Sequence, residues 1–311
     1  MSRNAAPIFR SSRGAPEPGG AHPLPSTRDW VAGARPRTLP AALVPVFVGT
    51  AVAAADGSVI WWRSLYALIV ALAIQIGTNY ANDYSDGVRG TDAARVGPVR
   101  LVAGGLAAPR EVRTASFCAF GIAAVAGLVL ALATTPWLLV VGGACLAAGW
   151  FYTGGPRPYG YAGFGEVFVF VFFGLVAVIG TAYLSLGRVT ALAVVAAIPV
   201  GLLATALLVV NNLRDLNSDR QAGKNTLAVR MGASATRHFY ATCVIGALAV
   251  VAVIAFWRPV ALIALAAVIP ALPPLRRVLD GAEGRDLVTA LVGTGTLQLA
   301  FGALLALGIA L

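Results

Sequence analysis

The sequence has few charged side chains. Only 12% of its 311 residues are Asp, Glu, Lys or Arg, whereas 58% are hydrophobic and the mean hydropathy is +0.80. This composition is typical of an integral membrane protein rather than of a large soluble core. We expect an all-α membrane protein, because a transmembrane β-barrel would require alternating polarity along every strand.

Cysteine and histidine are also scarce. The two histidines, His22 and His238, have no partners at the spacing of metal ligands. The three cysteines each lie within an apolar stretch and form no Cys-x-x-Cys pair: Cys118, Cys145 and Cys243. The sequence therefore supports neither a disulfide framework nor a zinc site nor histidine chemistry.

Basic residues are unevenly placed along the chain. The net charge of +10 would suggest nucleic acid as a partner of a soluble protein, but these residues are dispersed between apolar stretches, and we expect no nucleic-acid partner. Twenty of the 23 Lys and Arg fall in the N-terminal segment and in alternate loops, and the other loops contain only Arg63, Arg188 and Arg258. The positive-inside rule then places the N-terminus in the cytoplasm and the C-terminus outside.

Nine apolar stretches account for this pattern. The first runs from about residue 39 to 55, and the others centre near 72, 122, 142, 175, 199, 246, 266 and 300. We predict about nine transmembrane helices in an inner (cytoplasmic) membrane: pseudo-repeats of four helices at about 38–152 and 162–279, then a ninth helix at about 286–311. Residues 1–27 contain five prolines and are predicted to be a disordered cytoplasmic tail before a membrane domain of residues 28–311.

Amide and carboxylate side chains gather where the second apolar stretch ends. Gln75, Asn79, Asn82, Asp83 and Asp86 are spaced so that they share one face of a helix. A Gly-rich segment follows and contains Arg89, Asp92, Arg95 and Arg100. Carboxylates at membrane depth cost about 2.5 to 3.5 kcal/mol each on insertion scales, so they indicate a functional site.

A second copy of this arrangement begins at Asn211. Asp215 and Asp219 follow at intervals of four residues, and a Gly-rich basic segment comes next. Four apolar stretches separate the two copies, which places both at the cytoplasmic side, in parallel repeats around one cavity. The site is therefore expected to open to the cytoplasm.

The residue types in these motifs favour a magnesium site. Several facing carboxylates would repel one another without cations, and oxygen ligands without His or Cys favour Mg²⁺. Magnesium is usually held by one or two carboxylates together with substrate phosphates. The candidate ligands are Asp83, Asp86, Asp92, Asp215 and Asp219, and the candidate contacts to a diphosphate are Arg95, Arg100, Arg214 and Lys224, the single lysine of the chain.

The motif sequences resemble those of a known family. NDYSDGVRGTD, RVGPVRLVAGG and NNLRDLNSDRQAGKNTLAVRMG are similar to the aspartate-rich motifs of the UbiA superfamily of intramembrane prenyltransferases. WVAGARPRTLPAALVPVFVGTA and YTGGPRPYGYAGFGE resemble the branch that prenylates 1,4-dihydroxy-2-naphthoate in menaquinone biosynthesis. The likeness covers most of residues 30–232.

The resemblance implies roles for individual residues. It implies that Asp83, Asp86, Asp215 and Asp219 hold Mg²⁺ on an allylic polyprenyl diphosphate, that Asn82 and Asn211 support them, and that Arg100, Arg214 and Lys224 bind the diphosphate. The common superfamily pattern has a further Asp four residues after Asp86, where this chain has Gly90; Asp92 follows two residues later. The implied reaction is ionisation of the donor, attack by the naphthoate ring and loss of CO2, with Tyr152 and Glu166 as candidates for the base.

Other interpretations remain open. A sibling enzyme could use 4-hydroxybenzoate, haem or a sugar phosphate as the acceptor, and the motif carboxylates could be helix caps in a solvated loop. Tyr152 and Tyr161 are expected at the membrane interface, and Glu166 could cap a helix. A transporter with parallel repeats would carry charges near the centres of its spans, and these centres have none here. Homo-oligomerisation also stays open.

Overall fold

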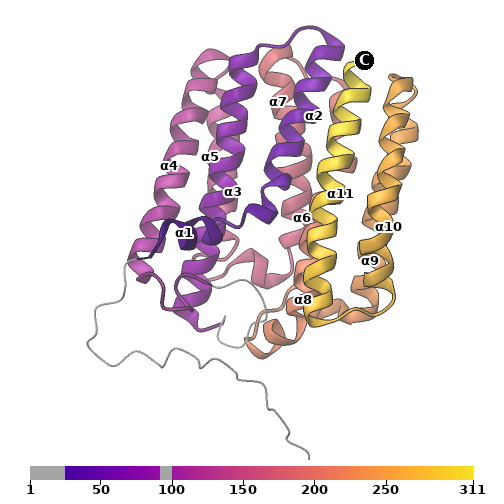
Figure 1. Ribbon diagram of the computed structural model, residues 1–311. Coiled ribbons are helices and arrows are strands. Elements are labelled where there is room, and N and C mark those ends of the chain that lie inside the picture. Colours follow the sequence, from indigo (N-terminus) through magenta and orange to yellow (C-terminus); the bar gives the residue numbers. More distant parts are fainter. Residues whose placement is uncertain (1–24, 92–99) are drawn as a thin grey trace, which may run out of the picture.

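A bundle of long, roughly parallel helices forms the computed structural model of the chain, which describes residues 25–91 and 100–311 (Figure 1). Two short elements, α1 (Thr27–Gly33) and η1 (Pro36–Thr38), lie across one end of the bundle before the long helices begin (Figure 1). In chain order these are α2 (Pro40–Asp56), α3 (Trp61–Arg89), α4 (Pro109–Ala133), α5 (Trp137–Phe151), then η2 (Tyr159–Ala162), α6 (Gly165–Val169), η3 (Phe170–Val176), α7 (Ala177–Leu186), α8 (Ala191–Gln221), α9 (Leu227–Ile254), η4 (Pro259–Ala267), α10 (Val268–Leu279) and α11 (Gly284–Ala310).

The expected all-helical membrane fold is confirmed. Within residues 25–91 and 100–311, seven helices are long and apolar enough to cross a membrane, or eight if the segment Thr27–Thr38 and α2, which meet at 53°, form one bent span. Helix α5 is apolar but has only 15 residues. Each of the nine predicted apolar stretches is helical, whereas the predicted number of nine crossings is not confirmed. Large apolar side chains on α4 remain exposed, as expected for a helix that faces lipid: Ile122, Val125 and Leu132.

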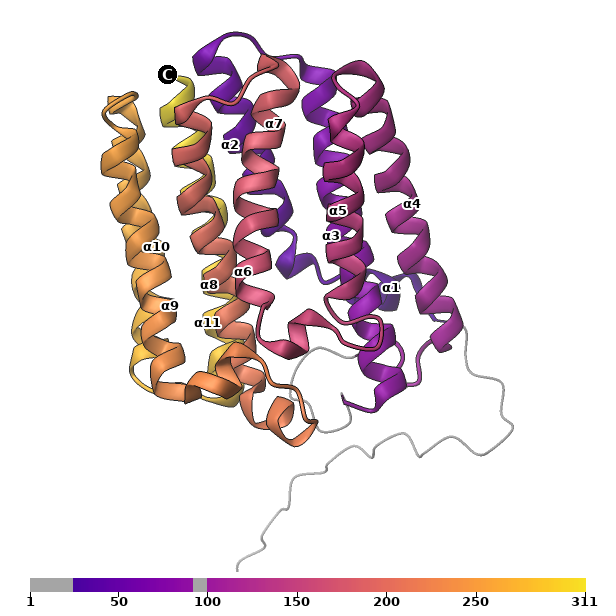
Figure 2. The same ribbon diagram turned by 180° about the vertical axis from the view of Figure 1, so that it is seen from behind.

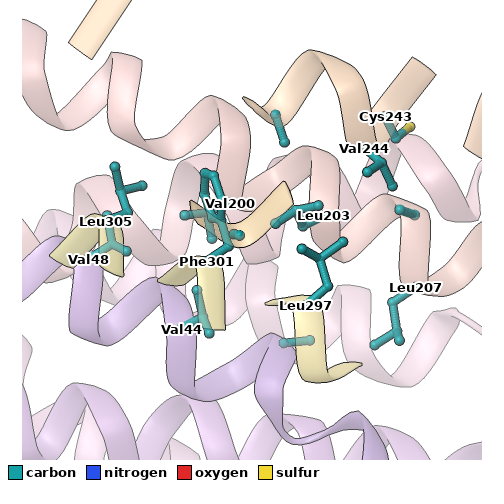
Figure 3. Packing of buried hydrophobic residues seen from close by; sticks show 14 of the residues in the cluster. Val44, Val48, Val200, Leu203, Leu207, Cys243, Val244, Leu297, Phe301 and Leu305 are labelled. Carbon is teal, nitrogen blue, oxygen red and sulfur yellow. The ribbon is translucent and has the colours of Figure 1, made fainter. Parts of the chain in front are cut away.

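Helix α8 lies at the centre of the hydrophobic core. In the apolar 18-residue stretch of α8, 72% is buried, which is the highest share among the membrane-spanning helices of the described residues. Valine and leucine side chains of α2, α8, α9 and α11 interdigitate around it, among them Val48, Val200, Leu203, Val244 and Leu305 (Figure 3). Because α8 carries the second aspartate motif, this packing gives that motif a rigid base.

Both aspartate motifs lie in the last turns of long helices. Helix α3 ends just after the first motif, at Gly90, whose φ of 71° places it in the left-handed region and whose N–H bonds the carbonyls of Asp86 and Gly87. Helix α8 ends just after the second motif, before Gly223, which also has a positive φ of 71°. The two ends lie at the same end of the bundle (Figure 2), and the C-terminus lies at the other (Figure 1). The predicted placement of both motifs at one side is therefore confirmed.

Candidate active site

A large cavity runs between the helices and meets a small polar cavity at the motif end of the bundle. The large cavity has a volume of about 1110 Å³ and is walled mainly by apolar residues of α2 to α5, η3, α7 and α8, whereas the small one has a volume of about 60 Å³. Asp86, Asp215, Asp219 and Lys224 line the small cavity. Five polar residues line both cavities and so mark the junction: Arg35, Asn82, Arg100, Tyr152 and Asn211.

Asp83 holds the backbone of the segment that follows the first motif. Its carboxylate oxygens accept hydrogen bonds from the backbone N–H groups of Leu101 at 3.0 Å and Val102 at 2.9 Å, and the residue is 1% exposed. The neighbouring Asn82 accepts a hydrogen bond of 2.6 Å from the hydroxyl of Thr153 through its side-chain oxygen. These two residues therefore fix the walls of the site as well as lining it.

Lys224 connects the two motifs. Its ammonium donates a hydrogen bond of 2.9 Å to the Asp86 carboxylate and lies 3.9 Å from a carboxylate oxygen of Asp219. It also lies 4.7 Å from the centre of the Tyr161 ring, a favourable cation–π position. The first and second motifs thus face each other across this buried lysine, as the sequence predicted for a single site.

Tyr161 lies in the site, beside Asp86 and Lys224. Its hydroxyl donates a hydrogen bond to the Asp86 carboxylate, and its backbone carbonyl accepts one of 2.9 Å from the N–H of Asn225. Burial, and then the neighbouring Asp86 charge, raise the pKa of the Tyr161 hydroxyl. The phenol therefore stays protonated at neutral pH and remains a donor to Asp86.

Arg89 fastens the loop between α5 and α6 to the end of α3. Its guanidinium donates hydrogen bonds to the carbonyls of Thr153 and Gly155 and lies 5.2 Å from the centre of the Tyr161 ring. Together with Lys224, it joins three segments over the polar cavity: the end of α3, the loop at 152–164 and the turn at 222–226. Each of the three segments contributes a residue to the lining of the polar cavity: Asp86, Tyr161 and Lys224.

Arg214 and Asp215 form a two-point ion pair. The Nε and Nη2 atoms of Arg214 each lie 2.7 Å from a carboxylate oxygen of Asp215, and both side chains are buried. Arg214 lines the large cavity and Asp215 the small one. Contact between Arg214 and an anionic substrate would thus involve a guanidinium that Asp215 already orients.

The two candidates for a base differ in their access to the cavities. Tyr152 lines both, but burial and the nearby Glu166 charge hold the pKa of its hydroxyl well above the ordinary value. A phenol of this kind is protonated at neutral pH and serves better as a hydrogen-bond donor than as a base. Glu166 lines neither cavity; it is buried in α6 and accepts a hydrogen bond of 2.9 Å from the amide of Asn212.

The polar residues earlier on α3 have a different task. Asn79 donates hydrogen bonds to the carbonyl of Ala34 at 2.8 Å and to the hydroxyl of Thr38 at 3.1 Å, and Gln75 donates one of 3.0 Å to the same hydroxyl. The sequence groups both amides with the motif because they share its helical face. The structure shows that they hold the turn before α2.

The donor set at the junction fits a magnesium ion that is completed by a phosphate ligand. Among the residues that the structure describes, no three His, Cys, Asp or Glu side chains gather closely enough to hold an ion by themselves. Magnesium usually binds one or two carboxylates, water and substrate phosphates, and the small cavity offers carboxylates and amide oxygens of both motifs. Asp92 and Arg95 lie outside the described residues, so their predicted contacts stay predictions.

Comparison with known proteins agrees with this geometry. The profile of the UbiA prenyltransferase family matches residues 42–291. The chain is 50% identical to the 1,4-dihydroxy-2-naphthoate octaprenyltransferase of Mycobacterium tuberculosis over 89% of this chain and 94% of that protein. It is 41% identical to the Escherichia coli protein of the same name, over 71% and 74%.

Solved structures share the fold at low sequence identity. A UbiA homologue from Aeropyrum pernix superimposes with a TM-score of 0.66 at 14% identity, over 86% of this chain and 97% of that one. A UbiA homologue from Archaeoglobus fulgidus, solved with GPP and Mg²⁺, gives a TM-score of 0.57 at 15% identity, over 89% and 99%. These structures show the shared fold, and the family profile together with the 50% identity to the M. tuberculosis protein shows that the chain belongs to the UbiA prenyltransferase family.

Proposed function

We propose that this protein transfers a polyprenyl group from an allylic polyprenyl diphosphate to 1,4-dihydroxy-2-naphthoate, releasing diphosphate and CO2 and giving demethylmenaquinol. The observation that carries the proposal is the junction of the two cavities, where both aspartate motifs and Lys224 adjoin a large apolar chamber. Relatives with up to 50% identity, named for this reaction, support the choice of acceptor.

The donor fits this junction in one orientation. Its apolar tail matches the large cavity, and its diphosphate matches the polar end, where Arg100, Arg214 and Lys224 supply positive charge. We assign the magnesium to Asp86, Asp215 and Asp219, with Asn82 and Asn211 in support and Asp83 fixing the adjacent backbone. Bound there, Mg²⁺ would neutralise charge on the departing diphosphate.

The side chains of the site would favour ionisation of the donor. As the bond between the allylic carbon and the diphosphate oxygen breaks, the half-buried Arg100 and the buried Lys224 stabilise the leaving diphosphate. Aromatic rings of Tyr159, Phe168 and Phe172 stack along the large cavity, at 4.0 Å and 5.9 Å between successive ring centres, and would supply aromatic surface to an allylic cation formed there. The apolar walls keep water away from that cation.

The acceptor would complete the reaction at the same junction. Its electron-rich ring forms the new carbon–carbon bond to the allylic carbon, and cleavage of the bond to the carboxylate releases CO2 and restores the aromatic ring. Tyr152, which lines both cavities, is placed to donate a hydrogen bond to an acceptor oxygen.

We further place the protein in the inner membrane, with residues 28–311 as its membrane domain and the site open to the cytoplasm.

An assay with alternative acceptors tests the proposal. The purified full-length protein is incubated in detergent with a polyprenyl diphosphate, Mg²⁺ and either 1,4-dihydroxy-2-naphthoate or 4-hydroxybenzoate, and both prenylated product and CO2 are followed. We expect product and CO2 in equal amounts with the naphthoate alone. Product with 4-hydroxybenzoate alone would support prenyl transfer but would refute 1,4-dihydroxy-2-naphthoate as the acceptor. No product with either acceptor would refute the proposed reaction.

A further inference from the structure

Arg35 has an unfavourable backbone conformation at the edge of the site. Its φ of 53° and ψ of 68° lie in the left-handed region, and it is the only non-glycine residue with a positive φ among residues 25–91 and 100–311. Residues with a Cβ rarely adopt this conformation, and where they do the strain is often associated with function. The surrounding structure must therefore impose it.

The polar face of α3 imposes this conformation. Asn79 bonds the carbonyl of Ala34, just before Arg35, and both Asn79 and Gln75 bond the hydroxyl of Thr38, just after it. The backbone N–H and the hydroxyl of Thr38 each donate a hydrogen bond of 2.9 Å to the Arg35 carbonyl. The turn at 34–38 is thus fixed from both sides, and Arg35 is held at its centre.

The fixed turn places the Arg35 guanidinium at the junction of the two cavities. Arg35 lines the large cavity together with Arg37 and Thr38, and it lines the small one together with Asn82, Asp86 and Arg100. Its Nη2 atom is buried and has no hydrogen-bond partner among the described residues. An unsatisfied buried guanidinium nitrogen is costly, and the residue that carries it lines the space where substrates would bind.

We infer that Arg35 is a substrate-binding residue that binds an oxyanion at the junction of the two cavities. The guanidinium is suited to the two-point binding of a carboxylate or a phosphate. This inference rests on the proposed function, whose substrates supply two such groups: the diphosphate of the donor and the carboxylate of the acceptor. The shared chemistry is an oxyanion, and the experiment distinguishes its two sources.

The test measures binding in the full-length protein without turnover. Titration calorimetry is performed with an unreactive donor analogue, geranyl thiolodiphosphate with Mg²⁺, and separately with 1,4-dihydroxy-2-naphthoate. The variants are Arg35→Gln and Arg35→Lys, and Arg28→Gln is the matched control, since it removes an exposed cation of the same N-terminal segment that lines neither cavity. We expect Arg35→Gln to raise the Kd of one of the two anions about 10- to 100-fold, Arg35→Lys to raise it less, and Arg28→Gln to leave it unchanged.

The two arms identify the oxyanion. If Arg35→Gln weakens binding of the donor analogue, Arg35 binds the diphosphate. If it weakens binding of the naphthoate instead, and leaves the Kd of 1,4-naphthalenediol, which lacks the carboxylate, unchanged, Arg35 binds the acceptor. Unchanged Kd values for both anions would overturn the inference. If the wild-type protein binds the donor analogue but not the naphthoate, the proposed acceptor is wrong, and the donor arm alone decides the role of Arg35.

A stability measurement separates binding from a structural role. Glycine adopts the Arg35 conformation without strain, so Arg35→Gly is expected to raise the thermal unfolding temperature of the ligand-free protein while weakening anion binding as Arg35→Gln does. Loss of stability in Arg35→Gly together with unchanged binding would show that Arg35 serves the fold and would refute the inference.

Discussion

Lys224 makes the contacts that bring the two aspartate motifs together. It is the single lysine of the sequence, it is 7% exposed, and it touches Asp86 of one motif and Asp219 of the other. A buried cation between two carboxylates would be redistributed when magnesium and diphosphate bind, because the diphosphate offers it new oxygen partners. Lys224 is therefore suited to hold the two motifs together before substrates bind and then to bind the donor diphosphate.

Replacement of Lys224 tests this role. Lys224→Gln is expected to raise the KM for the prenyl diphosphate at least tenfold and to leave the KM for the naphthoate nearly unchanged, because the charge acts on the diphosphate. Lys224→Arg, which keeps the charge, should recover part of the affinity. Steady-state kinetics with each substrate varied in turn measures both values, and an equal rise in the two KM values would contradict a donor-specific contact.

The aspartates of the site differ in what they do for the fold. Asp83 accepts hydrogen bonds from the backbone N–H groups of residues 101 and 102, whereas Asp219 is partly exposed and lies 3.9 Å from Lys224. An amide at position 83 cannot accept both bonds, so Asp83→Asn is expected to lower the free energy of unfolding by about 1 to 3 kcal/mol and to lower activity. Asp219→Asn should abolish activity with a smaller loss of stability.

Thermal unfolding and product formation, measured on the same preparations, check this contrast. Equal losses of stability in Asp83→Asn and Asp219→Asn would argue against the distinction between the two carboxylates. Near-normal turnover in Asp219→Asn would remove Asp219 from the proposed magnesium site.

The sequence predicted the site residues that follow one another at helical spacing, but not those whose partners are distant in sequence. The interval of four residues predicted that Asp215 and Asp219 share a helical face, and both line the polar cavity. Tyr161 and Arg35 have no such interval, since Tyr161 reaches Asp86 across 75 positions of sequence. Gln75 and Asn79 share the face of the motif, but their partners, in the turn at 34–38, could not be read from helical periodicity.

Among the elements of the bundle, η3 departs from regular α-helical geometry because it is a wider, π-type helix. Its residues 170–176 form a π-helix next to the large cavity, and Gly174 packs against the backbone of α8, where a Cβ would lie 2.6 Å from the Cα of Gly201. Such short π segments often occur at functional sites. The close approach of η3 to α8 fixes the position of the aromatic rings of Phe172 and Phe173 along the cavity.

A pair of alanine substitutions tests this packing. Gly174→Ala must push η3 away from α8, because the blocking atoms belong to the backbone, and we expect it to lower the free energy of unfolding by about 1 to 3 kcal/mol and to reduce turnover. Gly180→Ala, in the adjoining helix α7, has open space around its Cβ and should be neutral or stabilising by up to about 1 kcal/mol. Thermal unfolding in detergent compares the two, and equal midpoints would contradict a tight contact.

Element positions were predictable because hydropathy reports them directly, whereas local geometry was not. All nine apolar stretches became helical, and both motifs lie at helix ends as expected. The π-helical turns of η3 have the same apolar composition as an α-helix, so no periodicity predicts them. The 53° bend before α2 depends on the amides of α3, which are distant in sequence.

For the molecule as a whole, we predict the direction across the membrane from the placement of Lys and Arg, and the exposed tryptophans mark an interface with water. The polar site with Lys224 lies at one end of the bundle, whereas Trp61, Trp137 and Trp257 lie exposed at or beside helix ends that begin or finish away from it. Tryptophan favours the interface between lipid and water. The C-terminus lies at the end opposite the site (Figure 1), so a cytoplasmic site requires an external C-terminus.

Reporter fusions test this orientation in cells. Alkaline phosphatase joined after Leu311 is expected to be active, because it folds only outside the cytoplasm, whereas the same enzyme joined in the turn after Gln221 should be inactive. Fluorescence of green fluorescent protein at the same positions should show the reverse pattern. An inactive phosphatase at Leu311 together with a fluorescent fusion there would refute the proposed orientation.

The central claim is that both aspartate motifs bind one magnesium diphosphate. Its most direct test is the binding of geranyl thiolodiphosphate to the wild-type protein, Asp86→Asn and Asp219→Asn, each with Mg²⁺ and with a chelator, using circular dichroism to show that every variant is folded. We expect Mg²⁺ to strengthen binding to the wild type and either substitution alone to remove this magnesium-dependent gain. Retention of the full gain by either folded variant would show that one motif suffices and would contradict a shared site.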